Sequence, residues 1–227
     1  MIEARGLLKS YRNGGREVRP LDGVDFSCGR GEFVLIVGRS GSGKTTFLNV
    51  LGGLTRPTSG SVTIDGKDIL TLSDAASAAL RSRSIGFVFQ FPGLLSTLSA
   101  RENVALSAEI AGTVHKSDST GRAEHLLERV GLREKVDSPP AHLSGGELKR
   151  TAIARALMNC PSLILADEPT ADLDVDTERE IMELFREINR EGTTIIMVTH
   201  NIDLAVYASR VERMEKGKLV AVEPARF

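Results

Sequence analysis

A short segment in the first quarter of the chain has the composition and spacing of a phosphate-binding loop. Gly38–Thr45 reads GRSGSGKT and matches the pattern G-x-x-x-x-G-K-[ST] in full. The apolar run FVLIV at Phe33–Val37 precedes it, and we expect a helix at Thr45–Leu51. Glycines let successive backbone N–H groups converge on phosphate oxygens, and the helix N-terminus adds its dipole.

Two side chains of this loop would add chemistry to the backbone. Lys44 would reach the β- and γ-phosphates of a nucleotide, and the Thr45 hydroxyl would ligate Mg²⁺. The strand–loop–helix context favours this interpretation over a Gly/Ser-rich turn with an exposed lysine. The residues expected to contact the phosphates are Gly38, Arg39, Ser40, Gly41, Ser42, Gly43, Lys44, Thr45 and Thr46.

A phosphate loop requires a metal partner and a group that activates water. The apolar run at Leu163–Ala166 ends in Asp167, and Glu168 follows directly. A carboxylate at the end of a buried strand is costly unless it is paired or serves a cation, so Asp167 suits Mg²⁺, directly or through a water. Glu168 can then act as the base that takes a proton from attacking water. An ordinary strand-to-loop Asp-Glu pair ended by Pro169 is the alternative, which a complete phosphate loop disfavours.

A second segment predicts another anion-binding helix start. Leu143–Glu147 reads LSGGE, one hundred residues after the phosphate loop. Ser144 is a candidate N-cap, Gly145 and Gly146 leave N–H groups open, and Leu148–Leu157 continues as an apolar and basic helix. Taken alone, the segment is equally compatible with a capped helix that carries flexible glycines.

Buried strands must position these loops. Phe33–Val37, Leu163–Ala166 and Ile195–Val198 are apolar at consecutive positions, which is typical of parallel strands buried on both faces. Between the last two lies a helix with one apolar stripe at i, i+3, i+4 and i+7, and Gly192 marks its end. The stripe is Ile181, Leu184, Phe185 and Ile188.

The remaining segments predict two additions to this α/β core. The first thirty residues and Gly60–Ile69 are turn-rich and partly alternating, which favours a flanking antiparallel β layer. Residues 96–141 lack a strand pattern, and the stripe from Ala123 to Val130 before Gly131 indicates a helix. We therefore expect a single α/β domain spanning residues 1–227. Its P-loop NTPase core, with a mainly parallel sheet, covers 1–90 and 147–227, and an inserted helical subdomain covers approximately 91–146.

Composition excludes several classes of protein. Lys plus Arg number 29 and Asp plus Glu 30 among 227 residues, so the net charge of −1 is unlike that of a general nucleic-acid binder. The sequence contains no apolar run near the ~18 residues of a membrane span and no signal-peptide pattern. Cys28 and Cys160 are expected to be reduced thiols, and we expect a cytoplasmic chain.

Together these segments resemble the motifs of ATP-binding-cassette (ABC) ATPases, in the family's order and over nearly the whole chain. Tyr11 matches the aromatic residue that stacks on adenine, although a half-buried strand tyrosine is its alternative. Gln90 in FVFQ matches the glutamine that links the metal site to the helical lobe. Asp174 in ADLD matches the loop that crosses the dimer interface, and His200 in VTHN matches the switch histidine.

The resemblance implies an ATPase with ATP and Mg²⁺ as its cofactors. Catalytic roles would fall to Lys44, Gln90, Glu168 and His200, and Thr45, Gln90 and Asp167 would hold the metal. A second copy would form a head-to-tail dimer in which each ATP lies between one phosphate loop and the other LSGGE segment, with Ser144, Gly145, Gly146 and Asp174 at that interface. Glu147 departs from the family, which usually has glutamine there, and could weaken the approach of a polyanion.

The segments GGLTRPTSG, FQFPGLLSTLSARENV and LADEPTADLD resemble the branch of lipoprotein-release, macrolide-export and cell-division ATPases. That branch implies a separate transmembrane permease subunit and a location on the inner face of the cell membrane. The net charge of −1 further disfavours a nucleic-acid partner. The alternatives are an importer ATPase and, less favoured, a soluble ABC ATPase or a small-molecule phosphotransferase. Phe91–Leu98, FPGLLSTL, is expected either to pack at the base of the helical lobe or to form a docking groove for the membrane subunit.

Overall fold

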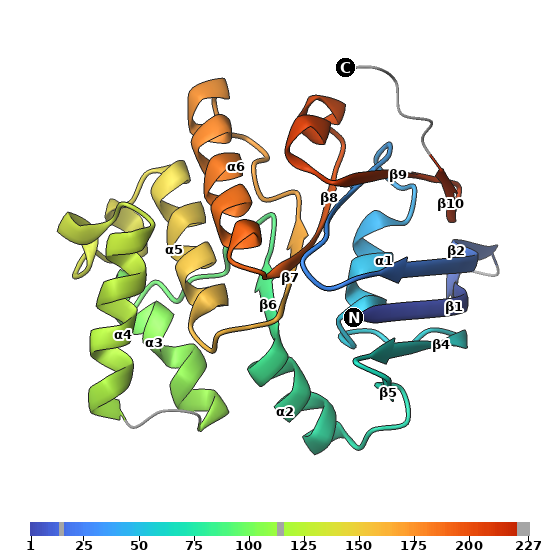
Figure 1. Ribbon diagram of the computed structural model, residues 1–227, viewed down its shortest axis with the longest axis horizontal. Helices are drawn as coiled ribbons and strands as arrows, with labels where there is room; N and C mark the ends of the chain where they lie inside the picture. The colour runs from blue at the N-terminus through green and yellow to red at the C-terminus, as the bar shows by residue number, and fades with distance from the viewer. Residues whose placement is uncertain (14–15, 113–115, 222–227) are drawn as a thin grey trace.

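The computed structural model describes residues 1–13, 16–112 and 116–221, arranged as two sheets with helices around them (Figure 1). The strands are β1 (Ile2–Asn13), β2 (Arg16–Cys28), β3 (Phe33–Val37), β4 (Ser59–Ile64), β5 (Lys67–Asp68), β6 (Ile85–Val88), β7 (Leu163–Asp167), β8 (Thr194–Thr199), β9 (Arg210–Glu215) and β10 (Lys218–Ala221). The α-helices are α1 (Lys44–Leu51), α2 (Asp74–Ser84), α3 (Ala100–Ala111), α4 (Lys116–Arg129), α5 (Gly145–Leu157) and α6 (Val175–Arg190). Short 3₁₀ helices are η1 (Arg133–Lys135), η2 (Pro140–His142) and η3 (Ile202–Tyr207).

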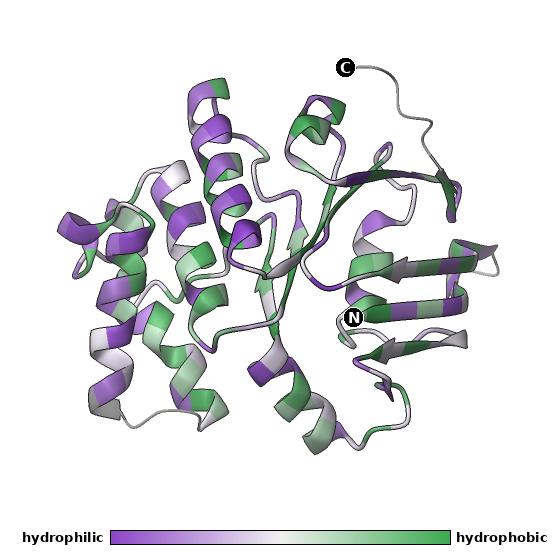
Figure 2. Ribbon diagram, in the orientation of Figure 1, coloured by the Kyte–Doolittle hydropathy of each residue, from purple (hydrophilic) through white to green (hydrophobic). Residues whose placement is uncertain are grey.

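The larger sheet explains the uninterrupted apolar runs. Its order is β10-β9-β3-β8-β7-β6, and β9, β3, β8, β7 and β6 pair in parallel. Alternate residues of each central strand enter different cores: in β3, Leu35 packs with α3 to α6 and Ile36 packs with α1. Both faces of the sheet are therefore covered, so every residue of β3, β7 and β8 is buried. Figure 2 shows β7 and β8 as largely hydrophobic, whereas α6 beside them carries many hydrophilic residues.

The smaller sheet has the order β2-β1-β4-β5 and is antiparallel throughout. Helix α1 lies between the two sheets (Figure 1), and the Phe47 ring meets the Phe26 ring of β2 edge-on at a centroid distance of 5.3 Å. This packing fixes the start of α1, and with it the end of the phosphate loop, against β2.

A helical segment lies on the far side of the larger sheet from the antiparallel layer. Helices α3 and α4 follow β6 in the chain and pack with α5. Leu127 of α4 and Ile153 of α5 belong to the hydrophobic core that covers this face of the larger sheet. Gly131 follows α4 with a φ of +79°, as the expected helix end requires.

The expected α/β architecture, with parallel core, antiparallel layer and helical segment, is confirmed. The sequence patterns did not indicate α2, β9 or β10. Helix α2 buries none of its residues, and β9 reads RVERME, so neither carries an apolar pattern. In the sequence patterns, strand β6 is represented only by the motif FVFQ, which contains the last two residues of this strand.

Candidate functional site

The phosphate loop connects β3 to α1 and requires glycine for steric reasons. Gly43 has a φ of +111°, and a Cβ there would lie 2.1 Å from the carbonyl oxygen of Pro20. A Cβ on Gly38 would lie 2.5 Å from the carbonyl oxygen of Met214. The loop is therefore held between β2 and β9, whose backbone leaves no space for a side chain at Gly38 or Gly43.

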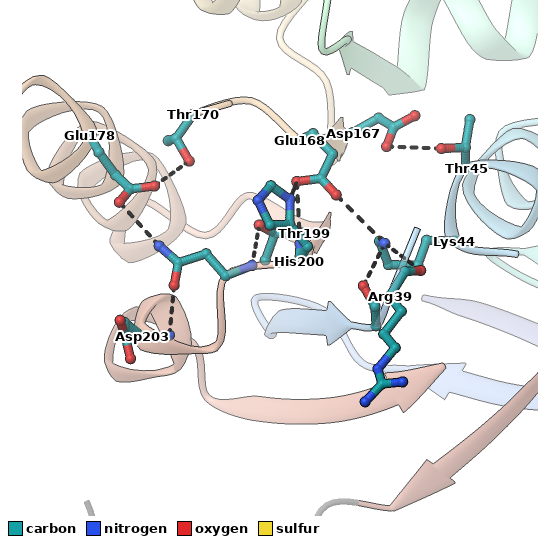
Figure 3. A network of polar contacts seen from close by, with 12 residues as sticks. Arg39, Lys44, Thr45, Asp167, Glu168, Thr170, Glu178, Thr199, His200 and Asp203 are labelled. Carbon is teal, nitrogen blue, oxygen red and sulfur yellow. Dashed lines mark hydrogen bonds and ion pairs between the residues drawn. The ribbon is translucent and has the colours of Figure 1, made fainter. Parts of the chain in front are cut away.

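Lys44, the first residue of α1, points back across the loop (Figure 3). Its Nζ donates hydrogen bonds to the carbonyl oxygens of Gly38 at 2.7 Å and Arg39 at 3.3 Å, and it lies 3.6 Å from Oε1 of Glu168. The side chain is only 7% exposed. A buried ammonium that is surrounded by oxygens is well placed to bind phosphate.

Asp167, the last residue of β7, accepts a hydrogen bond from Thr45 Oγ1 at 3.2 Å. Burial raises the pKa of Asp167 because it penalises the charged carboxylate, and the hydrogen bond from Thr45 opposes that shift. A cation at this position would stabilise the ionised form. Both side chains offer the oxygen ligands that Mg²⁺ prefers.

Glu168 lies between Lys44 and His200. Its backbone has a φ of +45°, an unfavourable value for a residue with a side chain, and its N–H donates to the carbonyl oxygen of Val198 at 2.9 Å. Its Oε2 accepts from the backbone N–H of His200 at 3.2 Å and lies 2.9 Å from Nδ1 of the same residue. One carboxylate oxygen thus faces the phosphate loop, and the other faces the histidine.

Lys44, Thr45, Glu168 and His200 line one cavity of about 560 Å³, together with the rest of Ser40 to Thr46, Pro20 and Gln90, whereas Gly38, Arg39 and Asp167 do not line it. Ser42 Oγ is buried and, within the described part of the chain, has no hydrogen-bond partner. An orphaned hydroxyl in a phosphate loop has an unused donor for a phosphate oxygen. The structure therefore brings together Lys44, Gln90, Glu168 and His200, which lie far apart in the sequence.

Other expected site residues lie elsewhere in the chain. Tyr11 is 46% exposed on β1, pairs with Val18 of β2, and has Lys9 Nζ 4.9 Å from its ring centroid. Tyr11 is not one of the described residues that line the phosphate cavity. Its strand partner is nevertheless only two residues from Pro20, which does line that cavity.

The LSGGE segment begins α5 through a reciprocal cap. Ser144 Oγ accepts from the Glu147 N–H at 3.3 Å, and Glu147 Oε2 accepts from the Ser144 N–H at 2.7 Å. Asp174 caps α6 in a similar way by accepting from the Thr177 N–H at 2.9 Å. Ser144, Gly145, Gly146 and Asp174 do not line the described phosphate cavity of their own chain.

Two residues that the sequence patterns did not identify also contact the site. Lys149 is buried and donates a hydrogen bond to the carbonyl oxygen of Gln90, and burial lowers its pKa. The sequence contained a signal for Lys149, because this lysine lies at helical spacing with Ala152, Ile153 and Ala156, and all four residues are buried. Glu178 on α6 accepts hydrogen bonds from two loops of the site, and no local sequence pattern indicates this.

A strand–loop–helix phosphate site with a carboxylate at the end of a neighbouring parallel strand defines a P-loop nucleoside triphosphatase. A family model described as ABC transporter matches residues 21–171. The chain belongs to the ABC transporter family, and it binds and hydrolyses ATP as a cassette of that family.

Named relatives match nearly the whole chain. The lipoprotein-releasing system ATP-binding protein LolD 1 of Caulobacter vibrioides is 45% identical over 97% of this chain and 95% of its own length. The macrolide export ATP-binding/permease protein MacB of Syntrophobacter fumaroxidans is 46% identical over 99% of this chain but 31% of its own length. Among solved structures, the ATP-binding cassette MJ0796 matches with a TM-score of 0.91 and 37% identity, over 99% of this chain and 100% of its own chain. That structure is a dimer in a post-hydrolysis state bound to ADP and Pi. Across the described residues, no helix combines the length and apolar character needed to cross a membrane.

Proposed function

We propose that this chain is the ATPase subunit of an export or lipoprotein-release complex, and that ATP-driven closure of a dimer acts on a separate transmembrane subunit. The convergence of Lys44, Glu168 and His200 on one cavity carries the hydrolytic part of the proposal. Relatives named for lipoprotein release and macrolide export, each about 45% identical, support the export part.

ATP would lie with its phosphates in the loop from Gly38 to Thr46. Backbone N–H groups, Lys44 and the free hydroxyl of Ser42 would bind the phosphate oxygens. Tyr11, close to Pro20 through its pairing with Val18, would stack on adenine, a contact worth about 1–3 kcal/mol. Lys44 would exchange its contact with Glu168 for the γ-phosphate, which frees the carboxylate for water.

Thr45, Gln90 and Asp167 would hold Mg²⁺. Their oxygens suit a hard cation, and the raised pKa of Asp167 identifies a carboxylate that a cation would stabilise. Among the described residues there is no cluster of three His, Cys, Asp or Glu side chains that could hold a metal. When bound, a magnesium ion would neutralise charge on the transferred phosphoryl group.

Glu168 would take a proton from the attacking water as the new bond to the γ-phosphorus forms and the bond to the β–γ bridging oxygen breaks. The products are then ADP and phosphate, with the proton on the carboxylate. His200, whose Nδ1 lies 2.9 Å from Glu168, would orient that carboxylate and contact the γ-phosphate. Each group is thus placed at the carboxyl end of a parallel strand, where ligands of such sheets bind.

A second copy would complete each ATP site. The LSGGE segment does not line the phosphate cavity of its own chain in the described structure, so a partner chain would supply this segment to the bound ATP. A dimer would place Ser144, Gly145 and Gly146 over the ATP of the other chain, with Asp174 nearby. The solved dimer of a cassette with 37% identity supports this arrangement.

A groove between α2, β6, α3 and α5 is the proposed docking site for a helix of the membrane subunit. It measures about 540 Å³ and is lined by Leu54, Phe87, Phe89, Ile110 and Arg155 among others, and it includes Pro92 and Gly93 of the expected segment. Arg155 donates to the carbonyl oxygens of Pro92 and Gly93 at 2.5 and 2.9 Å, which fixes one wall. Docking there would place the chain on the cytoplasmic face of the membrane. Residues of approximately 91–146 would then move as a helical subdomain against a core formed by residues 1–90 and 147–227.

Glu168→Gln tests the hydrolytic assignment. The amide keeps the shape of the side chain but cannot accept a proton, and loss of a general base typically lowers turnover by about 10²–10⁴-fold. We expect that loss in phosphate release, with ATP affinity within about twofold of the wild-type value by fluorescent-nucleotide titration. Near-normal hydrolysis in this variant would refute the assignment.

A further inference from the structure

Glu178 connects the two loops that carry the hydrolytic residues. From the first turn of α6, its Oε1 accepts a hydrogen bond from Thr170 Oγ1 at 2.7 Å, and its Oε2 accepts from Asn201 Nδ2 at 3.1 Å (Figure 3). Thr170 is buried and belongs to the loop that follows β7, whereas Asn201 belongs to the loop that follows β8. The two carboxylate oxygens of one side chain therefore serve one loop each.

Each of these contacts is close to a hydrolytic residue. Thr170 is two residues after Glu168, and Asn201 is directly after His200. Asn201 is fixed in turn, because its backbone N–H donates to Thr199 Oγ1 at 3.1 Å and its Oδ1 accepts from the Asp203 N–H at 3.0 Å. A displacement of Glu178 would thus be passed to both loops.

The pair Glu168–His200 needs such external support. Glu168 has a left-handed φ of +45°, and so does Asp172 in the same loop at +66°; such conformations persist only where the surroundings hold them. The His200 side chain is 68% exposed, so packing contributes little to its position. The Glu168 N–H bond to Val198 and the His200 N–H bond to Glu168 hold the two residues directly, and the Glu178 side chain adds a connection between the loops that follow them.

We propose that Glu178 is a positioning residue for ATP hydrolysis, which sets the separation of Glu168 and His200 by bridging Thr170 and Asn201. The inference rests on the roles proposed above for Glu168 and His200. It assigns to Glu178 no contact with ATP, so its removal should lower kcat while leaving KM for ATP unchanged.

Glu178→Met removes both acceptors and keeps a side chain of similar length. Thr170 Oγ1 and Asn201 Nδ2 then have no acceptor on α6, whereas Glu178→Gln could still accept from Asn201 and donate to the Thr170 hydroxyl. We expect kcat to fall about tenfold with KM within about twofold, because a misplacement of ~1 Å near reacting groups can cost up to ~10²-fold. Asn201→Asp alone should also lower kcat, since two carboxylates would then face each other.

The double variant Glu178→Gln/Asn201→Asp exchanges donor and acceptor and restores the bridge. The amide introduced on α6 would donate to one oxygen of the carboxylate introduced after β8, whose other oxygen still accepts from the Asp203 N–H. We expect kcat to recover to within about threefold of the wild type, a coupling that contacting residues show and independent ones do not. Glu187→Gln, an exposed site further along α6, is the matched control and should leave kcat unchanged.

The outcomes separate this inference from the proposed function. Unchanged kcat in Glu178→Met, or equal losses in Asn201→Asp and in the double variant, would overturn the positioning role. If Glu178→Met does not fold, a folded and active double variant supports the bridge, and an unfolded one overturns it. If Glu168→Gln loses turnover and the effects of the Glu178→Gln and Asn201→Asp substitutions on kcat are additive, only the positioning role of Glu178 is rejected. If Glu168→Gln keeps full turnover, the proposed function is rejected.

Discussion

The carboxylate of Glu168 and the imidazole of His200 lie 2.9 Å apart, just beyond the ends of two paired parallel strands. Asp167 of β7 is in register with Val198 of β8, so Glu168 leaves its strand beside the residues that lead to His200. The phosphate loop leaves β3, the other neighbour of β8. Three consecutive strands of one sheet therefore supply the phosphate loop, the histidine and the glutamate.

The two-site dimer predicts nucleotide-dependent assembly. In the Glu168→Gln variant, ATP with Mg²⁺ should shift the chain from monomer to dimer in size-exclusion chromatography with light scattering, because bound ATP is not hydrolysed. ADP should not cause the shift. Adding Ser144→Arg should block it by filling the anion site on α5, and thermal unfolding should show only the ~1 kcal/mol cost of a lost cap. A monomer at saturating ATP would count against the sandwich arrangement.

The raised pKa of Asp167 predicts that this residue lowers the stability of the nucleotide-free chain. The folded state disfavours the charged carboxylate, so stability is lost as pH rises through the folded pKa and the loss is absent below the unfolded pKa. Asp167→Asn should therefore raise the unfolding temperature at about pH 7, with an advantage that shrinks in acid, while Mg²⁺-dependent hydrolysis is lost. Asp203→Asn, at an exposed carboxylate, should show no such pH-dependent gain; an equal gain there would contradict the interpretation.

Glu147 has two effects that a pair of variants can separate. Its carboxylate accepts from the Ser144 N–H, and Lys135 Nζ lies 3.5 Å away and partly offsets the charge. Glu147→Gln keeps an acceptor for the cap and removes a negative charge beside a phosphate site, so KM for ATP should fall modestly and stability should change little. Glu147→Ala should instead lower stability by about 0.5–2 kcal/mol through the lost cap. Identical unfolding temperatures for both variants would argue against the cap.

The apolar groove predicts how the chain reaches the membrane. Ile110 lines it and is 76% exposed, so Ile110→Asp should change stability by no more than about 0.5 kcal/mol. Hydrolysis by the isolated chain should be unchanged, but the tagged chain should move from the washed membrane fraction of its own cells to the soluble fraction. Val206→Asp, an exposed apolar site outside the groove, is the control. Undiminished membrane recovery of the Ile110 variant would rule the groove out as the docking site.

Features that depend on neighbouring residues could be predicted from the sequence alone. The phosphate loop needs glycines at fixed spacing between a strand and a helix, and the buried strands are uninterrupted apolar runs, so both could be read directly. The cap at Ser144 and the end of α4 at Gly131 are also local, and the expected positions agree with the structure. The resemblance to ABC ATPases added Gln90 and His200, which no local rule would have selected.

Which of these residues meet is a consequence of tertiary packing. Strand order is set by packing on both faces of the sheet, and that order places β8 between β3 and β7 although β7 precedes it in the chain. Helix α2 buries none of its residues and β9 is rich in charged residues, so neither gave an apolar pattern that could be recognised in the sequence. The contacts of Glu178 with Thr170 and Asn201 span 8 and 23 residues and follow from the position of α6 against two strand ends, so a pattern of nearby residues could not contain them.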